Sequence, residues 1–175
     1  MPLTKVTQPM TDGLTRVSST PPQDVTGLIQ AQFVVPTWAK KTTILFSGVS
    51  SVSGGGLLVQ VGNDLTNYET NGYLGSTSLN LNGSLPSVAQ SVSYGFSITT
   101  SMAPATTVHG TFSLYKMGAG LRYAASSLLA PSDVAATYSF AGSKVAAQYD
   151  VTKIKATFAT SDVFDAGFIS AIFEG

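Results

Sequence analysis

The sequence is poor in charge and contains no cysteine. Only 10% of its 175 residues are charged, and nine basic residues balance nine acidic ones, which leaves a formal net charge of +0. An average soluble domain has about 25% charged residues. Because no basic excess is available to neutralise phosphates, the composition argues against nucleic acid as a partner. The absence of cysteine excludes disulfides, thiolate nucleophiles and cysteine-based metal sites.

Long apolar runs and helical periodicity are also lacking. No stretch is continuously apolar over the length of a membrane span, and the first residues contain no apolar core of a signal peptide, so we expect no membrane insertion. Hydrophobic residues nevertheless make up 43% of the chain. A neutral, weakly charged monomer tends to associate. We therefore expect much of the surface to be covered by copies of the same chain or by a larger assembly.

Alternating apolar and polar residues predict β-strands in most of the chain. Val92, Tyr94, Phe96 and Ile98, for example, alternate with Ser and Gly, which is the period of a half-buried strand. Gly- and Asn-rich turns separate such segments, a pattern typical of an all-β sandwich or jelly roll. The predicted strands are residues 28–35, 42–49, 57–61, 92–98, 108–115, 134–140, 144–149, 153–159 and 167–173. Residues 126–130 are expected to form one helical turn at most.

Residues 1–27 differ from the rest of the chain. They lack apolar periodicity and contain several prolines and an Asp-Gly pair. Such a segment cannot bury enough apolar surface to fold alone. The sequence therefore predicts an extended N-terminal arm over residues 1–27 and a single β-sandwich domain over residues 28–175.

The strand predicted over residues 167–173 is apolar on both faces. Phe168 and Ile172 would lie on one face, and Ile169 and Phe173 on the other. A strand of this kind is expected where both faces are covered, in a core or between subunits. Together with the sparse charge, it predicts a homo-oligomer, with a homotrimer as the expected state, in which these four residues contribute to the subunit contact.

A spaced series of segments points to a family. The segments are Trp38 to Ser50, Leu57 to Gly62, Asn71-Gly72-Tyr73, and Phe164-Asp165-Ala166-Gly167 with the short apolar strand that follows it. This series resembles the C-terminal β-domain family of bacteriophage tail fibre and spike proteins. The opening Leu3-Thr4-Lys5-Val6-Thr7 also resembles the starts of many phage fibre and spike proteins, where this end faces the virion.

The resemblance implies a location in the virion and other virion proteins as partners. It implies that the arm docks to the particle, with Leu3, Lys5 and Val6 as candidate docking residues. The implied function is that of a non-enzymatic short tail fibre or receptor-binding protein. The alternative is a head fibre, a capsid decoration protein or an adaptor between virion parts.

Candidate catalytic groups are few, and we expect no enzyme activity, cofactor or metal. His109 is the only histidine, and no Gly-x-Ser-x-Gly motif supplies a nucleophile. Asp162 and Asp165 flank a predicted turn, where Asp side chains commonly bond nearby backbone amides. A cation site or a catalytic carboxylate pair is the weaker alternative there. The glycines at 54–56 are interpreted as a hairpin connection, because no Gly-Lys-Ser/Thr follows them.

Tyrosines in polar segments are the remaining candidates for binding. Tyr68 and Tyr73 lie in a polar region, residues 63–78, that is predicted to be a loop. Their rings could stack on sugar faces while neighbouring amides and hydroxyls bond sugar hydroxyls. Both residues are therefore candidates for binding a neutral or weakly charged glycan of the host surface. The alternative for each is a structural role, in which the ring packs and the hydroxyl stays exposed.

Overall fold

The computed structural model of the chain describes residues 16–64, 67–81, 94–99, 101–104, 106–118, 121–144, 149–160 and 162–175, together with the backbone of residues 87–89. Within these residues every regular element is a β-strand, and the strands form two antiparallel sheets. The predicted all-β class is confirmed. No helix in this part of the chain is long and apolar enough to cross a membrane.

The larger sheet has nine strands in the order β1-β14-β4-β10-β11-β12-β7-β8, and β2 also pairs with β14. Its long central strands are β14 (Phe164–Glu174), β4 (Lys41–Ser51), β10 (Val108–Lys116), β11 (Tyr123–Pro131), β12 (Ala136–Lys144) and β7 (Tyr73–Leu81). Its edge strands are β1 (Val17–Ser19), β2 (Gln23–Asp24) and β8 (Ser87–Ala89). Edge strands this short expose little backbone for pairing with another chain.

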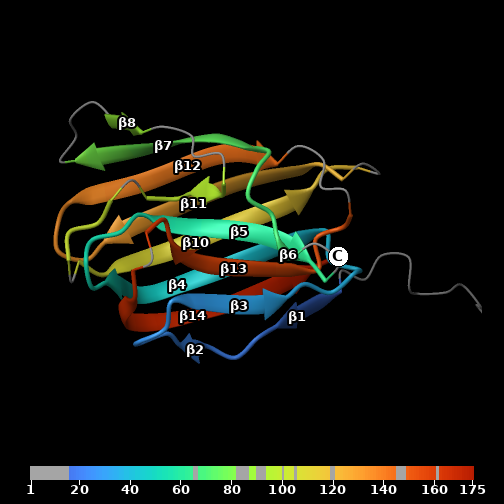
Figure 1. Cartoon of the computed structure of the whole chain (residues 1–175), viewed down its shortest axis with the longest axis horizontal. Coiled ribbons are helices and arrows are strands. Elements are labelled where there is room, and N and C mark those ends of the chain that lie inside the picture. The colour runs from blue at the N-terminus through green and yellow to red at the C-terminus, as the bar shows by residue number, and fades with distance from the viewer. Residues whose placement is uncertain are drawn as a thin grey trace, which may run out of the picture.

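The smaller sheet has five strands and lies in front of the larger one in Figure 1. Its strands are β3 (Gln30–Val34), β13 (Lys153–Phe158), β5 (Leu57–Asn63), β6 (Asn67–Tyr68) and β9 (Phe96–Ser97). The order is β3-β13-β5-β6, with β9 also paired to β5. One face of this sheet packs on the larger sheet. The other face, called the outer side below, points away from it.

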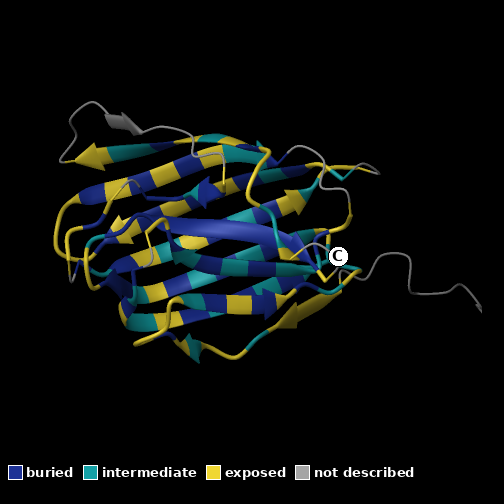
Figure 2. Cartoon of the chain, viewed as in Figure 1, coloured by how far each residue is buried: buried dark blue, intermediate teal, exposed yellow. Residues whose placement is uncertain are grey.

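One hydrophobic core lies between the two sheets. Alternate residues of most strands point inward, which produces the alternating bands of Figure 2. Ile44 and Phe112 of the larger sheet belong to the same buried cluster as Val59 and Ile154 of the smaller sheet. Each burial of such a side chain stabilises the fold by about 1.5–3 kcal/mol.

Phe96 of β9 extends this core beyond the long strands of the smaller sheet. Its ring centroid lies 4.9 Å from that of Tyr73, 5.5 Å from that of Phe112 and 5.7 Å from that of Phe140. These three rings come from β7, β10 and β12. A strand of two residues therefore covers part of the inner face of the larger sheet with one aromatic side chain.

Most predicted strands are confirmed. The strands predicted at 28–35, 42–49, 57–61, 108–115, 134–140, 153–159 and 167–173 correspond to β3, β4, β5, β10, β12, β13 and β14. Of the strand predicted at 92–98, only Phe96–Ser97 forms one, and residues 90–93 lie outside the described residues. Of the strand predicted at 144–149, Lys144 ends β12 and residues 145–148 lie outside the described residues.

Two long strands were not predicted as strands. Residues 126–130, for which one helical turn at most was expected, lie in β11. The loop predicted over residues 63–78 is wrong in its second half, which forms β7. In both strands the inward positions include small or polar residues, such as Ala125, Ser127 and Thr77. The apolar alternation that would have identified the strands is therefore weak.

The described part of the predicted arm belongs to the larger sheet. β1 and β2 both pair with β14, and the side chain of Val25 is fully buried in the core. The amide of Arg16 donates to the carbonyl of Gly175 at 2.8 Å. The candidate docking residues Leu3, Lys5 and Val6 lie outside the described residues.

Candidate functional site

The carboxylate of Asp162 joins the end of β4 and the connection after it to the residue that precedes β14. It accepts hydrogen bonds from the Ser51 hydroxyl and from the amides of Ser53, Gly55 and Val163, whose nitrogens lie 3.1, 3.1 and 2.8 Å from its oxygens. The predicted bonding to an amide nearby in the sequence is confirmed for Val163 alone, and the predicted turn is wrong at its far end, because Asp165 lies in β14. Burial alone would raise the pKa of Asp162, but these hydrogen bonds outweigh it and lower the pKa to about 2.

Asp165 and His109 also have structural partners. The exposed carboxylate of Asp165 accepts a hydrogen bond from the Ser50 hydroxyl at 3.4 Å. Nδ1 of His109 accepts one from the amide of Gly48 at 3.1 Å. His109 lies where the pairing of β4 with β10 shifts register, so its ring supports a bulge. Among the described residues, no group of three or more His, Asp or Glu could hold a metal ion.

Tyr73 is a core residue. Its side chain is 2% exposed, and its hydroxyl accepts a hydrogen bond from the Val61 amide at 2.9 Å and donates to the Glu69 carbonyl at 3.2 Å. Burial raises the pKa of this hydroxyl. The structure corrects the glycan-binding prediction for Tyr73, because a ring inside the core cannot stack on a sugar.

A buried ion pair lies against Tyr73. Lys144 is 1% exposed, and its Nζ lies 2.5 Å from Oε2 of Glu69 and 5.0 Å from the centroid of the Tyr73 ring. A buried ammonium group is tolerated only when it is paired, because leaving water is costly for a charge. This pair therefore ties the end of β12 to the connection between β6 and β7.

Tyr68, by contrast, lies on the outer side of the smaller sheet and is half-buried. Its hydroxyl donates to Oε1 of Gln32 at 3.0 Å. The Nζ atoms of Lys153 and Lys155 lie 5.2 and 4.4 Å from the centroid of its ring, within the range of cation–π attraction. Lys155 also donates to Oε1 of Gln30 at 3.2 Å. We call these five residues the Tyr68 cluster.

A groove of about 310 Å³ shares Lys155 and Gln30 with this cluster. Other residues that line it include Leu58, Gln60, Tyr94 and Thr157. Nε2 of Gln60 donates to the backbone carbonyl of Tyr94 at 2.7 Å. The next residue, Gly95, passes so close to β5 that a Cβ atom there would lie 2.6 Å from the Leu58 side chain. These two contacts fix Tyr94, which is 36% exposed, beside the groove.

The sequence prediction did not identify the residues that line the groove. Only one feature of the sequence pointed to some of them. The alternation over residues 153–159 places Lys153 and Lys155 on one face of a strand. The neighbours of this strand cannot be read from that alternation. Only the pairing of β13 with β3 on one side and β5 on the other brings Gln30 and Gln60 beside Lys155.

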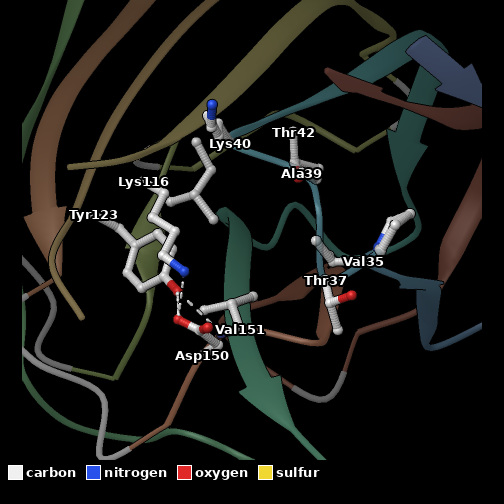
Figure 3. Close-up of a pocket in the computed structure, with 11 residues that line it drawn as sticks. Val35, Thr37, Ala39, Lys40, Thr42, Lys116, Tyr123, Asp150 and Val151 are labelled. Atoms are coloured by element: carbon white, nitrogen blue, oxygen red, sulfur yellow. Dashed lines mark hydrogen bonds and ion pairs between the residues drawn. The ribbon is translucent and has the colours of Figure 1, made fainter. Parts of the chain in front are cut away.

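A second hollow, shown in Figure 3, is too small for a sugar. Its volume of about 20 Å³ leaves room for about one water molecule. Lys116 and Tyr123 both point toward Asp150, with Nζ of Lys116 2.7 Å and the Tyr123 hydroxyl 3.5 Å from its Oδ1. The Tyr123 hydroxyl in turn accepts the Val151 amide at 3.0 Å. These contacts give the hollow a structural role.

β14 has one buried and one outward face. Ile169 and Phe173 are buried in the core of the single chain, whereas Phe168 is 49% exposed and Ile172 is partly exposed. The structure therefore corrects the predicted subunit contact for Ile169 and Phe173, since core side chains cannot also reach a partner. Phe168 and Ile172 remain on the outer surface.

The outer face of the larger sheet is weakly polar and nearly free of charge. Its central residues on β4, β10 and β11 are Thr43, Leu45, Thr111, Ser113, Ser126 and Leu128. Leu45 lies opposite Thr111, and Thr111 lies opposite Leu128, which is 59% exposed. At one end of this face Nζ of Lys41 lies 2.6 Å from Oε2 of Glu174, so that charges there are paired.

Comparison of the chain with protein families, with curated proteins and with solved structures found no match.

Proposed function

We propose that this chain is a non-enzymatic bacteriophage virion protein of the short tail fibre or receptor-binding type. In this proposal a homotrimer of β-sandwich domains binds a glycan of the bacterial surface through the groove beside the Tyr68 cluster. The observation that carries the proposal is this groove, where an exposed tyrosine, two glutamine amides and a lysine surround about 310 Å³. The segments that resemble phage fibre and spike domains support the location in a virion.

The chemistry of the groove suits a saccharide. Ligand sites occupy about 300–1,000 Å³ and combine apolar contact with a few fixed polar groups. Leu58 and the Tyr94 ring supply apolar surface, and the amides of Gln30 and Gln60 can both donate to and accept from hydroxyl groups. The volume lies at the lower end of this range, so the groove accommodates a small part of a longer polysaccharide.

The outer face of the larger sheet supports assembly with further copies. Six strands, β14 to β7 in sheet order, spaced about 4.8 Å apart and about 30 Å long present roughly 900 Å². Each partner of a stable complex buries about 800 Å². Three grooves on one particle component would raise the overall affinity through effective concentration, even if each groove binds weakly.

Binding to an immobilised panel of purified bacterial lipopolysaccharides, capsular polysaccharides and teichoic acids tests the function. We expect the fluorescently labelled chain to bind at least one of them, and Tyr94→Ala to lower that binding about tenfold or more, because the variant removes a rim of the groove. Tyr149→Ala is the matched control, since Tyr149 is 41% exposed and does not line the groove.

Absence of binding to the whole panel would overturn the receptor-binding role. A head fibre, capsid decoration protein or adaptor would then be the better hypothesis. A cryo-EM map of the particle distinguishes these roles, because a tail fibre is present in few copies at the tail and a decoration protein in many copies on the head. Binding that survives Tyr94→Ala would keep the function and place the site elsewhere.

A further inference from the structure

The Tyr68 cluster carries two positive charges without carboxylate partners in the described part of the chain. The ion pairs found there are Lys41–Glu174, Lys116–Asp150 and Lys144–Glu69. Neither Lys153 nor Lys155 takes part in any of them. In a chain with a formal net charge of +0, two such lysines on one strand face form a local positive site.

These lysines are held by neutral groups. Lys155 donates to the Gln30 side chain, and both ammonium groups lie against the ring of Tyr68. Burial lowers the pKa of Lys155, because its charged form loses contact with water. A bound anion would compensate this loss, as a carboxylate does in an ion pair.

The carboxylates near the groove do not form ion pairs with Lys153 or Lys155. Asp162 lines the groove, but its oxygens accept hydrogen bonds from the Ser51 hydroxyl and from backbone amides. Glu69, next to Tyr68 in the sequence, is paired with the buried Lys144. The groove therefore has a positive end at Lys155, an amide-lined part at Gln30 and Gln60, and the carboxylate of Asp162, whose charge is stabilised by its own hydrogen-bond donors.

We infer that the groove binds a sugar residue that carries an acidic group, a carboxylate or a phosphate, and that Lys155 and Lys153 contact this group. The amides of Gln30 and Gln60 and the ring of Tyr94 then contact the rest of the saccharide. This inference rests on the proposed function, because it specifies the ligand of the same site. It replaces the neutral or weakly charged glycan expected from the sequence with an anionic one.

The ligand itself provides the first test. Each polysaccharide that binds the wild-type chain is compared with its carboxyl-reduced form and with its dephosphorylated form. We expect one of the two treatments to weaken binding at least tenfold, and the effective treatment identifies whether the acidic group is a carboxylate or a phosphate. If both treated forms bind like the untreated polysaccharide, the inference is overturned while the proposed function stands. If no polysaccharide binds at all, the proposed function is refuted, and the inference that rests on it is refuted with it.

The protein provides the second test. Lys155→Met keeps the aliphatic stem and removes the charge, and we expect it to weaken binding of the acidic polysaccharide about tenfold or more. It should bind the treated polysaccharide as the wild type does. Lys40→Met is the matched control, because the exposed Lys40 lies away from the groove and its loss changes the net charge equally. Circular dichroism checks that both variants are folded. Equal binding of the acidic polysaccharide by Lys155→Met, Lys153→Met and the wild type would refute the inference.

Discussion

The carboxylate of Asp162 joins three parts of the chain. It bonds the end of β4 through the Ser51 hydroxyl, the following connection through the amides of Ser53 and Gly55, and the residue before β14 through the amide of Val163. These hydrogen bonds are buried or partly buried, so removal of the carboxylate would take this acceptor from all four donors, of which the Gly55 amide also donates to the Ser51 hydroxyl. One side chain thus fixes both the residue before β14 and the glycine-rich connection.

Replacement of Asp162 by asparagine should therefore destabilise the fold. The new –NH₂ group is a donor that faces other donors, and a lost hydrogen bond to a charged group costs about 1.5–3 kcal/mol. We expect Asp162→Asn to lower the free energy of unfolding by about 2 kcal/mol at neutral pH, measured by urea denaturation. Asp165→Asn, at an exposed position near the start of β14, is the control and should change it by less than about 0.5 kcal/mol.

The effect of Asp162 should also depend on pH. Its pKa is about 2 in the folded chain, below the ordinary value of 3.8. The folded state therefore favours the charged form, and this stabilisation is complete above pH 3.8 and is lost as the pH falls toward 2. The difference in unfolding free energy between wild type and Asp162→Asn should shrink over that interval. A difference that stays constant would contradict the proposed hydrogen bonding.

Only the local part of the role of Asp162 was predictable, and the role of Tyr73 was not predictable. An aspartate commonly bonds an amide close to it in the sequence, as Asp162 does with Val163, but its bonds to Ser51, Ser53 and Gly55 form only in the assembled sheet. The position of Tyr73 depends on Val61, whose amide and carbonyl both lie within hydrogen-bond distance of its hydroxyl. β6 is only two residues long, and although the Glu69 amide that follows it donates to the Val61 carbonyl, the Val61 amide donates to the Tyr73 hydroxyl in place of a strand carbonyl. The need for a substitute partner appears only in the assembled sheet.

Among the strands, β14 is shaped by two register shifts at its start. They lie between Phe164 and Ala166 and between Ala166 and Phe168. Gly167 lies at the second shift, in the segment that resembles phage fibre and spike domains, and its φ is +110°. A Cβ atom on it would lie 2.6 Å from the carbonyl oxygen of Gly48 on β4. The glycine therefore allows two strand backbones to approach at a bulge.

Alanine at this position should be costly. Gly167→Ala combines an unfavourable φ with a collision against backbone, and we expect the free energy of unfolding to fall by about 3 kcal/mol. Gly27→Ala is the control, because Gly27 has a φ of +79° but no atom within 4 Å of an added Cβ. Backbone strain alone should cost that variant about 1 kcal/mol. Similar urea midpoints for the two variants would show that the close approach contributes nothing.

Whether a strand could be predicted from the sequence depended on how clearly its apolar and polar side chains alternate. β13 was predictable because the inward Ile154, Ala156 and Phe158 alternate with lysine and threonine. β11 was not, because the exposed Leu128 stands next to the buried Leu129 and its other inward positions include alanine and serine.

For the whole molecule, the two outer faces differ in chemistry. The outer side of the smaller sheet carries the groove and the two lysines of the Tyr68 cluster. The outer face of the larger sheet carries small uncharged residues with Leu128 and Phe168 exposed among them. If the second face is buried between copies, the first remains free for a ligand in every copy. The trimer and the glycan site then do not compete for surface.

Charge on the outer face of the larger sheet should separate the copies and leave each one folded. Leu128 and Phe168 are 59% and 49% exposed in the single chain, so the monomer tolerates glutamate at both positions. In a subunit contact, the same charges would lose water without gaining partners. We expect light scattering to give a trimer for the wild type and a monomer for the Leu128→Glu, Phe168→Glu double variant, with unchanged circular dichroism. Met117→Glu, at a 54% exposed position in a turn, should stay trimeric. A wild-type chain that is monomeric at micromolar concentration would refute the assembly, and a trimeric double variant would place the contact on another surface.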